Sequence, residues 1–496
     1  MMPRNADSRF SRSVTFNLLG LGLPLLVATV TIPYLLKMLG EERFGILSLV
    51  WTFLAYTGLL DLAAGRALTQ RVSVLLPEGR VREGAALCWT VFAVLGLTGV
   101  LAGVALAVLA PAIATRWLRL PAELALESER AFRVIALAVP VTIGTDAARG
   151  LLEAHRKFGV VNAVRVVGGV WTFAGPVFAL RLGGDLGMIA AFLAAGKATV
   201  LGLLLYSCFR TMPALKTPSL AAPRHLIDLV SFGGWVTVSN VAGMLLGYSD
   251  RFLLARFALA SLAYYVTPGE IVTKLWLIPA AFTTVYFPEF SAGLAAAQDR
   301  VRVHFRECLG SVLLLLFPIV LGIVCLAPEI LSFWISSEFA EKSARLMQWL
   351  TVGVLINSAA QVYLVLILAK GWGRRAALAE LAILPAYLGT LWWAVSHAGL
   401  EAVAILWTVR AALELVWLAV IASDIVLARN ERRTMLSGLA GIVFIGLGFS
   451  AHRPAVRSLV LAVGLMLWLV AALRHGSTRT GSPSAEGPCE GPSLGC

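Results

Sequence analysis

The sequence predicts an all-α integral membrane protein with about fourteen transmembrane helices. Of its 496 residues, 59% are hydrophobic and only 14% are charged, and the mean hydropathy is +0.83. Soluble domains are typically about 45–50% apolar and about 25% charged. A chain this apolar cannot enclose its hydrophobic residues in a core surrounded by water, so it needs the hydrocarbon of a bilayer as solvent.

The spacing of the apolar stretches gives the expected helices in order. A helix needs about 20 mostly apolar residues to cross the hydrocarbon. The connecting loops are short, and the largest, 111–132, is mostly polar and compatible with a short surface helix. The thirteenth stretch is the shortest. The expected helices cover 14–38, 44–64, 85–110, 133–152, 158–180, 186–209, 228–250, 263–287, 308–328, 344–369, 376–396, 400–427, 436–450 and 455–473.

The loops alternate in charge along the whole chain. Basic loops, such as those with Arg156-Lys157 and Arg374-Arg375, alternate with neutral or acidic loops, such as the one with Glu338. Lys and Arg accumulate in cytoplasmic loops. The pattern therefore predicts an even number of helices with both termini in the cytoplasm. It also accounts for the net charge of +13 without nucleic-acid binding.

A basic loop near residues 210–225, which contains three prolines, divides the expected helices into two halves. We expect a six-helix bundle over 1–215 and a second over 226–428. Two additional helices would follow within 436–473. The segment 475–496 is rich in Ser, Gly and Pro and is expected to form a disordered cytoplasmic tail.

Several cations fall within the expected helices. Ionisable groups at membrane depth face a cavity or a partner, because burying them in lipid costs several kcal/mol. Arg165 and Lys197 have no acidic residue at i±3 or i±4 on their own helix. A cavity lined by such cations would suit an anionic head group such as a diphosphate, which arginine can bind through two parallel hydrogen bonds. The candidates for this cavity are Arg149, Arg165, Lys197, Lys274 and Arg66.

Other charged residues at membrane depth are candidates for coupling or gating. Asp146 with Arg149, and Arg410 with Glu414, lie on one helix face and could instead simply neutralise each other. Asp61 and Asp250 lie near helix ends, where they could only anchor loops. The coupling or gating candidates are Asp61, Asp146, Asp250, Arg251, Glu270, Arg410 and Glu414.

No catalytic or cofactor motif is apparent. The six histidines are scattered, and no cysteine pair has the spacing of a metal site. A phosphate-binding glycine loop followed by Lys and Ser or Thr is also missing, so ATP is not expected to drive the protein. We therefore expect a transporter without cofactor or metal, driven by a gradient, with protons or sodium as candidate coupling ions. Prolines inside several helices fit hinges for alternating access.

Five stretches resemble one known family. Residues 32–49 read Ile32-Pro-Tyr-Leu-Leu-Lys-Met-Leu-Gly-Glu-Glu-Arg-Phe-Gly-Ile-Leu-Ser-Leu, and 59–70 read Leu59-Leu-Asp-Leu-Ala-Ala-Gly-Arg-Ala-Leu-Thr-Gln. With 232–240, 248–254 and 287–291, these stretches resemble bacterial polysaccharide flippases of the O-antigen type. Ala63 stands where that family usually has glycine.

The resemblance implies a fold and a function. The fold would be V-shaped and similar to that of multidrug (MATE) transporters, with two six-helix bundles around a cavity and two extra C-terminal helices. The function would be to move an undecaprenyl-diphosphate-linked oligosaccharide from the cytoplasmic to the periplasmic leaflet, for cell-surface polysaccharide biosynthesis. Implied partners are this lipid-linked oligosaccharide, membrane lipids, and the polysaccharide polymerase and chain-length machinery.

Three alternatives remain open at this point. A multidrug-type small-molecule antiporter could use Asp61 and Asp146, although the surplus of Arg and Lys argues against a cationic drug. A membrane-embedded polysaccharide polymerase, ligase or glycosyltransferase would usually carry a large extramembrane loop, and every loop here is short. A non-transporting assembly scaffold is the third.

Overall fold

The computed structural model of the chain describes residues 5–57, 64–219, 241–296, 298–426, 456–466 and 468–469. Nearly all of these residues are helical. Nine helices in this part of the chain are long and apolar enough to cross a membrane, so the protein is a multi-pass membrane protein. The expected total of fourteen remains a prediction, because the expected helix 436–450 and most of the expected helix 228–250 lie outside the described residues.

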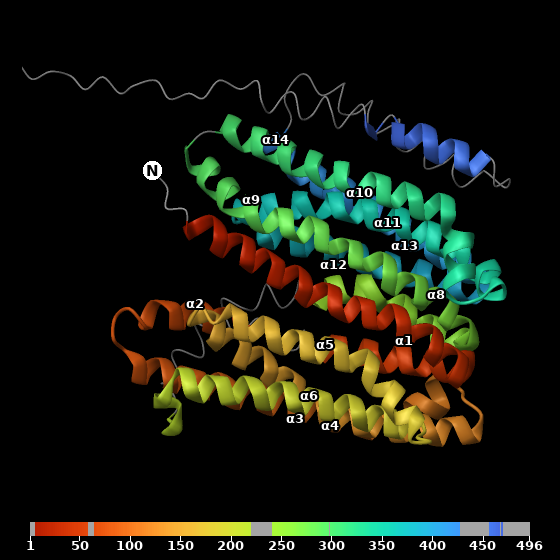
Figure 1. Cartoon of the computed structure of the whole chain (residues 1–496), viewed down its shortest axis with the longest axis horizontal. Helices are drawn as coiled ribbons and strands as arrows, with labels where there is room; N and C mark the ends of the chain where they lie inside the picture. The colour runs from red at the N-terminus through yellow and green to blue at the C-terminus, as the bar shows by residue number, and fades with distance from the viewer. Residues whose placement is uncertain are drawn as a thin grey trace, which may run out of the picture.

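The elements follow one another along the chain with short connections, and Figure 1 shows their labels. A further helical segment, 241–257, precedes α8. The bounds are α1 (Asn5–Thr57), α2 (Ala64–Leu75), α3 (Val81–Ala112), η1 (Ile113–Trp117), α4 (Ala122–Ala154), α5 (Phe158–Arg181), α6 (Leu186–Thr211), η2 (Pro213–Lys216), α8 (Leu259–Val272), η3 (Thr273–Trp276), α9 (Leu277–Ala296), α10 (Gln298–Trp334), α11 (Ser337–Ala369), α12 (Gly373–His397), α13 (Gly399–Ile421) and α14 (Ser423–Val426).

The long element α1 contains a sharp turn at Gly40. This glycine has φ 72° and ψ 172°, a conformation that a residue with a side chain rarely adopts. The chain therefore reverses there, and α1 comprises two helices, as Figure 1 shows in red. The turn lies between the expected helices 14–38 and 44–64.

The region 111–132 differs from the expected polar loop. After α3, a single π-helical turn, η1, ends at Trp117, and α4 already begins at Ala122 rather than near 133. Arg133, at the start of the expected helix, pairs with Glu129 of this extension at 2.8 Å, one helical turn apart. Such an i,i+4 pair favours a continuous helix across the junction of the polar and apolar stretches.

The expected single helix 263–287 is longer and is interrupted. It runs as α8, the 3₁₀ turn η3 and α9, from Leu259 to Ala296. Pro279 lacks the backbone N–H that would bond to the carbonyl of residue 275. The helix therefore tightens into a 3₁₀ turn at the residues just before this proline.

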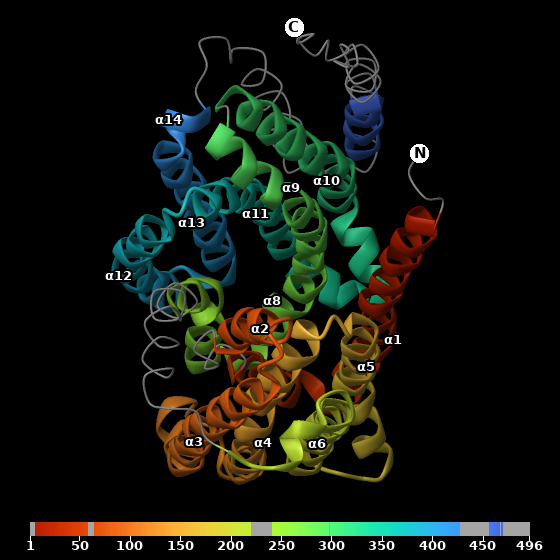
Figure 2. The ribbon, with the colours of Figure 1, turned by 90° about the vertical axis from the view of Figure 1, so that its left-hand side faces the viewer.

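The described helices form two groups. In the first group (5–211), α4 packs against α2, α3 and α6, while α1 packs against α5. In the second group (241–426), α11 packs against α8, α9, α10 and α13, and α12 packs against α13. Figure 2 shows the two groups one above the other, and α1 links them by packing against α8. The expected bundle boundaries, 1–215 and 226–428, remain a prediction.

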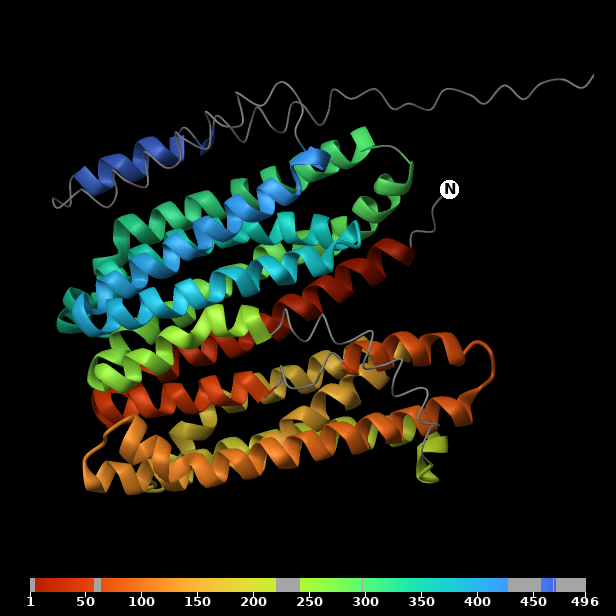
Figure 3. The same cartoon turned by 180° about the vertical axis from the view of Figure 1, so that it is seen from behind.

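A further helix, 456–466, lies against α10. Arg457 Nη2 pairs with Glu329 Oε1 at 2.9 Å, and Trp468 Nε1 donates to the Leu314 carbonyl at 2.6 Å. This helix lies within the expected helix 455–473, and Figure 3 shows it in blue outside the second group. The expected tail 475–496 lies outside the described residues.

Two glycines bring α3 and α4 into close contact. A Cβ added at Gly99 would lie 2.6 Å from Cα of Pro140, and one added at Gly103 would lie 2.6 Å from the Ala136 carbonyl oxygen. Both neighbours are backbone atoms, which cannot move aside as a side chain can. Small residues thus let these two membrane helices approach closely.

We expect Gly99→Val to lower the free energy of unfolding by about 2 kcal/mol, because the added methyl groups overlap the backbone of α4. Gly96→Val, on the same helix, is the control, since a Cβ there has nothing within 4 Å. Thermal unfolding of the purified protein in detergent compares the two variants. Equal melting temperatures would show that the close α3–α4 contact does not limit stability.

Candidate functional site

The charged residues at the start of the second group form a connected network. Arg251, in the segment 241–257, is 8% exposed, and its Nη1 donates to Glu270 Oε1 of α8 at 2.8 Å. Lys274, in η3, contacts the other carboxylate oxygen of Glu270 at 3.4 Å. Glu270 therefore contacts two cations, one on each carboxylate oxygen.

Asp250 is the neighbour of Arg251 in sequence, but it is held by different groups. It is 3% exposed. Its Oδ1 accepts from the backbone N–H of Arg251 at 2.8 Å, and its Oδ2 accepts from the hydroxyl of Tyr265. The Arg251 guanidinium points elsewhere and also donates to Thr52 Oγ1 of α1 at 3.4 Å. Asp250 is thus a buried carboxylate held by an amide and a hydroxyl.

A second network lies on α13. Arg410 Nη1 pairs with Glu414 Oε2 at 2.9 Å, and Asn357 Nδ2 of α11 approaches the same oxygen at 3.4 Å. The Arg410 guanidinium lies 5.5 Å from the centre of the Trp407 ring and 5.9 Å from that of Tyr387. The geometry therefore agrees with the alternative given above, in which these two charges neutralise each other.

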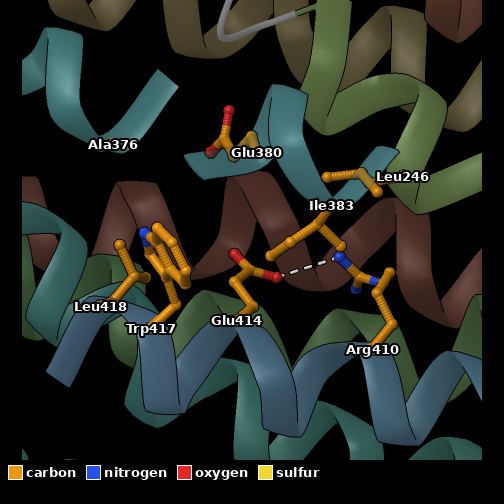
Figure 4. A pocket seen from close by; sticks show the side chains of 8 residues that line it. All are labelled: Leu246, Ala376, Glu380, Ile383, Arg410, Glu414, Trp417 and Leu418. Atoms are coloured by element: carbon orange, nitrogen blue, oxygen red, sulfur yellow. Dashed lines mark hydrogen bonds and ion pairs between the residues drawn. The ribbon is translucent and has the colours of Figure 1, made fainter. Parts of the chain in front are cut away.

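A small pocket adjoins this pair, between the segment 241–257, α12 and α13. Figure 4 shows the carboxylate of Glu380, on α12, on the far side of the pocket from Arg410 and Glu414. The space open to the centre of a water-sized sphere is about 10 Å³. This is about the room that one water molecule needs, so the pocket does not accommodate a lipid head group.

The first group has a different charge balance. On α4, Arg149 Nη2 pairs with Asp146 Oδ1 at 2.9 Å, and its Nε lies 3.7 Å from Glu153 Oε1. Lys197, on α6, is partly buried and near enough to Asp146 to be influenced by its charge. Arg165, on α5, is exposed, and neither it nor Lys197 forms an ion pair or hydrogen bond with another described residue.

These positions give the first group a positive surplus, whereas the six candidates of the second group carry three positive and three negative charges. The first group has three described candidate cations, Arg149, Arg165 and Lys197, and only two carboxylates lie near any of them, those of Asp146 and Glu153. Of the other candidates, Arg66 lies near the start of α2, and its side chain is not described by the structure. Asp61 lies outside the described residues.

Two polar residues of the second group, Tyr265 and Asn357, were missed at the sequence level, and a third, Glu380, is a charged residue at membrane depth that was not among the site candidates. Tyr265, Asn357 and Glu380 all lie in or beside the two networks. Glu380 carries a usable signal, because it is a carboxylate inside an apolar stretch. Tyr265 and Asn357 are uncharged and carry a weaker signal, and only the fold brings them to their partners.

Comparisons with known proteins agree with this architecture. The polysaccharide biosynthesis protein family matches residues 34–344, which is more than half of the chain, and the chain belongs to this family. A Shigella flexneri protein named as a candidate O-antigen transporter is 26% identical over 409 residues, which cover 81% of this chain and 95% of that protein.

Solved structures share the fold at low sequence identity. A lipid II flippase, MurJ, in an inward closed conformation superposes with a TM-score of 0.68 at 11% identity, covering 92% of this chain and 99% of the other. An inward-facing multidrug resistance MATE transporter of the MOP superfamily gives a TM-score of 0.62 at 13% identity, covering 88% and 100%. The protein therefore shares the fold of these two transporters.

We expect Arg410→Leu to lower the free energy of unfolding by about 3 kcal/mol, because it leaves the Glu414 carboxylate buried without its cation. The double variant Arg410→Leu, Glu414→Leu should regain much of that loss, because no unpaired charge remains. Thermal unfolding in detergent measures both.

Arg133→Leu is the control for this comparison. Its pair with Glu129 is largely exposed, with 56% of the arginine side chain accessible, so we expect a loss below about 1 kcal/mol. A double variant that is no more stable than Arg410→Leu alone would show that packing around Trp407, rather than charge pairing, sets the effect.

Proposed function

We propose that the protein is a flippase that moves an undecaprenyl-diphosphate-linked oligosaccharide repeat unit from the cytoplasmic to the periplasmic leaflet of the bacterial inner membrane. It would do so by alternating access, with both termini in the cytoplasm, and would serve cell-surface polysaccharide biosynthesis. Polysaccharide polymerase and chain-length machinery would be its partners. Family membership and the flippase-type fold support the general class.

The positive surplus in the first group is the observation that favours a diphosphate-bearing substrate. Arg149 lies near the end of α4 at Ala154, and Arg165 lies near the start of α5 at Phe158, so both are close to the α4–α5 connection. Lys197 lies near the middle of α6. These cations would thus extend from the basic end of the helices towards the middle of the membrane.

Such an arrangement suits the chemistry of the proposed substrate. A diphosphate carries negative charge that must be compensated at each depth it passes, while the lipid tail stays in the hydrocarbon. Arg165 and Lys197 could compensate that charge without first breaking an ion pair. Arg149 could bind after exchanging its contact with Glu153, which at 3.7 Å is longer than its contact with Asp146. Protons or sodium ions are the candidate coupling ions.

Replacing Lys197 or Arg165 with Gln should lower the rate of flipping about tenfold, the loss expected when one charge-assisted hydrogen bond to a phosphate is removed. The measurement uses proteoliposomes that contain the full chain and an undecaprenyl-diphosphate-linked oligosaccharide, and follows its appearance in the opposite leaflet.

Arg133→Gln is the matched control, since it removes an exposed arginine that pairs only within α4, and its rate should equal that of the wild type. Arg165→Lys should keep part of the activity by retaining the charge. If Lys197→Gln and Arg165→Gln both flip the lipid at the wild-type rate, these residues do not bind the diphosphate. Transport of cationic drugs in place of the lipid would favour the multidrug-type antiporter.

A further inference from the structure

An arginine from the second group binds the end of a helix in the first group. Arg256 lies at the end of the segment 241–257, and its Nη1 donates to the carbonyl oxygens of Arg116, at 3.0 Å, and Trp117. These carbonyls belong to η1, where the helix that starts with α3 ends. Carbonyls at a helix C-terminus lack intrahelical partners and carry the negative end of the helix dipole, so a guanidinium is well suited to them.

A second polar contact joins the groups nearby. The Tyr264 hydroxyl, on α8, donates to Glu41, which follows the Gly40 turn of α1. The same hydroxyl accepts from Lys342 Nζ of α11 at 2.9 Å, and Lys342 also pairs with Glu338 at 2.9 Å. Glu41 of the first group is thus bound by Tyr264 of the second, and Lys342 holds the tyrosine hydroxyl.

Apolar packing accompanies these contacts. A Cβ added at Gly45 would lie 2.9 Å from the Leu259 carbonyl oxygen, so the return helix of α1 lies directly against the start of α8. The rings of Phe53 and Phe252 meet edge to face at 5.1 Å. The two groups are therefore in close contact on this side of the interface.

These contacts lie at one end of the molecule. Figure 1 and Figure 3 show the turn of α1, the α3–α4 connection, the start of α8 and the α10–α11 connection at the same end, opposite the α2–α3 turn. The loops at this end are the neutral or acidic ones, which the charge pattern predicts to face away from the cytoplasm.

We propose that the contact of Arg256 with η1 and the contact of Glu41 with Tyr264, whose hydroxyl also binds Lys342, form a latch. This latch holds the two groups together at the non-cytoplasmic end and separates when the transporter opens there. The Arg256 contact is exposed to solvent and therefore individually weak, whereas the contact of Tyr264 with Glu41 is partly buried. Only these few polar contacts have to break and re-form during a transport cycle. The inference rests on the alternation in the proposed function, but not on its substrate.

The test measures the opening of this end directly, with the full chain in lipid nanodiscs and no substrate. Spin labels on Glu123→Cys of α4 and Glu341→Cys of α11, both exposed positions, report the distance between the groups. Cys489 and Cys496 are replaced by Ser, and the four described cysteines are buried. Arg256→Ala and Tyr264→Phe should each raise the ratio of long to short distances about threefold or more, as expected when a weak contact is lost.

Controls separate the latch from general destabilisation. Arg133→Ala breaks an ion pair inside the first group only and should leave the distance distribution unchanged. Arg256→Lys keeps the charge and should give a smaller shift than Arg256→Ala. Glu41→Ala combined with Tyr264→Phe should shift the ratio no more than either alone, because both remove the same contact.

Distance distributions that match Arg133→Ala in both the Arg256→Ala and Tyr264→Phe variants would overturn the proposal. That outcome would leave the proposed function standing, since lipid flipping is measured separately. Conversely, the expected shift of the distance distribution in a protein that flips no lipid-linked oligosaccharide would support the latch and contradict the proposed substrate.

Discussion

The hydrocarbon of the bilayer contains no water to bind backbone or charged groups, and this constraint governs the whole molecule. Backbone polar groups are satisfied within helices, because other exposed structure in lipid would leave them unpaired. Charged side chains follow the same requirement. Arg251 with Glu270, and Arg410 with Glu414, are paired at 2.8 and 2.9 Å. Removing either partner of such a pair costs far more than the pair itself contributes.

The two groups of helices differ in how their charged side chains are compensated. The candidate charges of the second group neutralise one another and leave a pocket no larger than a water molecule beside Arg410. The first group keeps Arg165 and Lys197 without an ion pair among the described residues. The candidate charges of the second group thus balance, whereas those described in the first group leave a positive surplus.

Much of the fold could be predicted, because apolar length and loop charge are local properties of the sequence. Helix ends were less predictable, since α4 begins at Ala122, within the polar stretch before its apolar residues, and Pro279 follows the turn η3. The pair of Arg410 and Glu414 was visible as an i,i+4 spacing. The contacts of Arg251 with Glu270 and of Arg256 with η1 were not, because they join different helices and depend on how the chain folds back.

The contact of Arg256 with η1 has a consequence for sequence variation. Its acceptors are main-chain oxygens, which every amino acid supplies. The side chains at positions 116 and 117 can therefore change in related proteins while the acceptors remain. What must persist is the path of the chain, which includes Arg119 at φ 53°, in the left-handed region, just after η1. Sequence variation at this end of the protein should thus be limited by the backbone conformation around η1 in the first group and by the single arginine, Arg256, in the second.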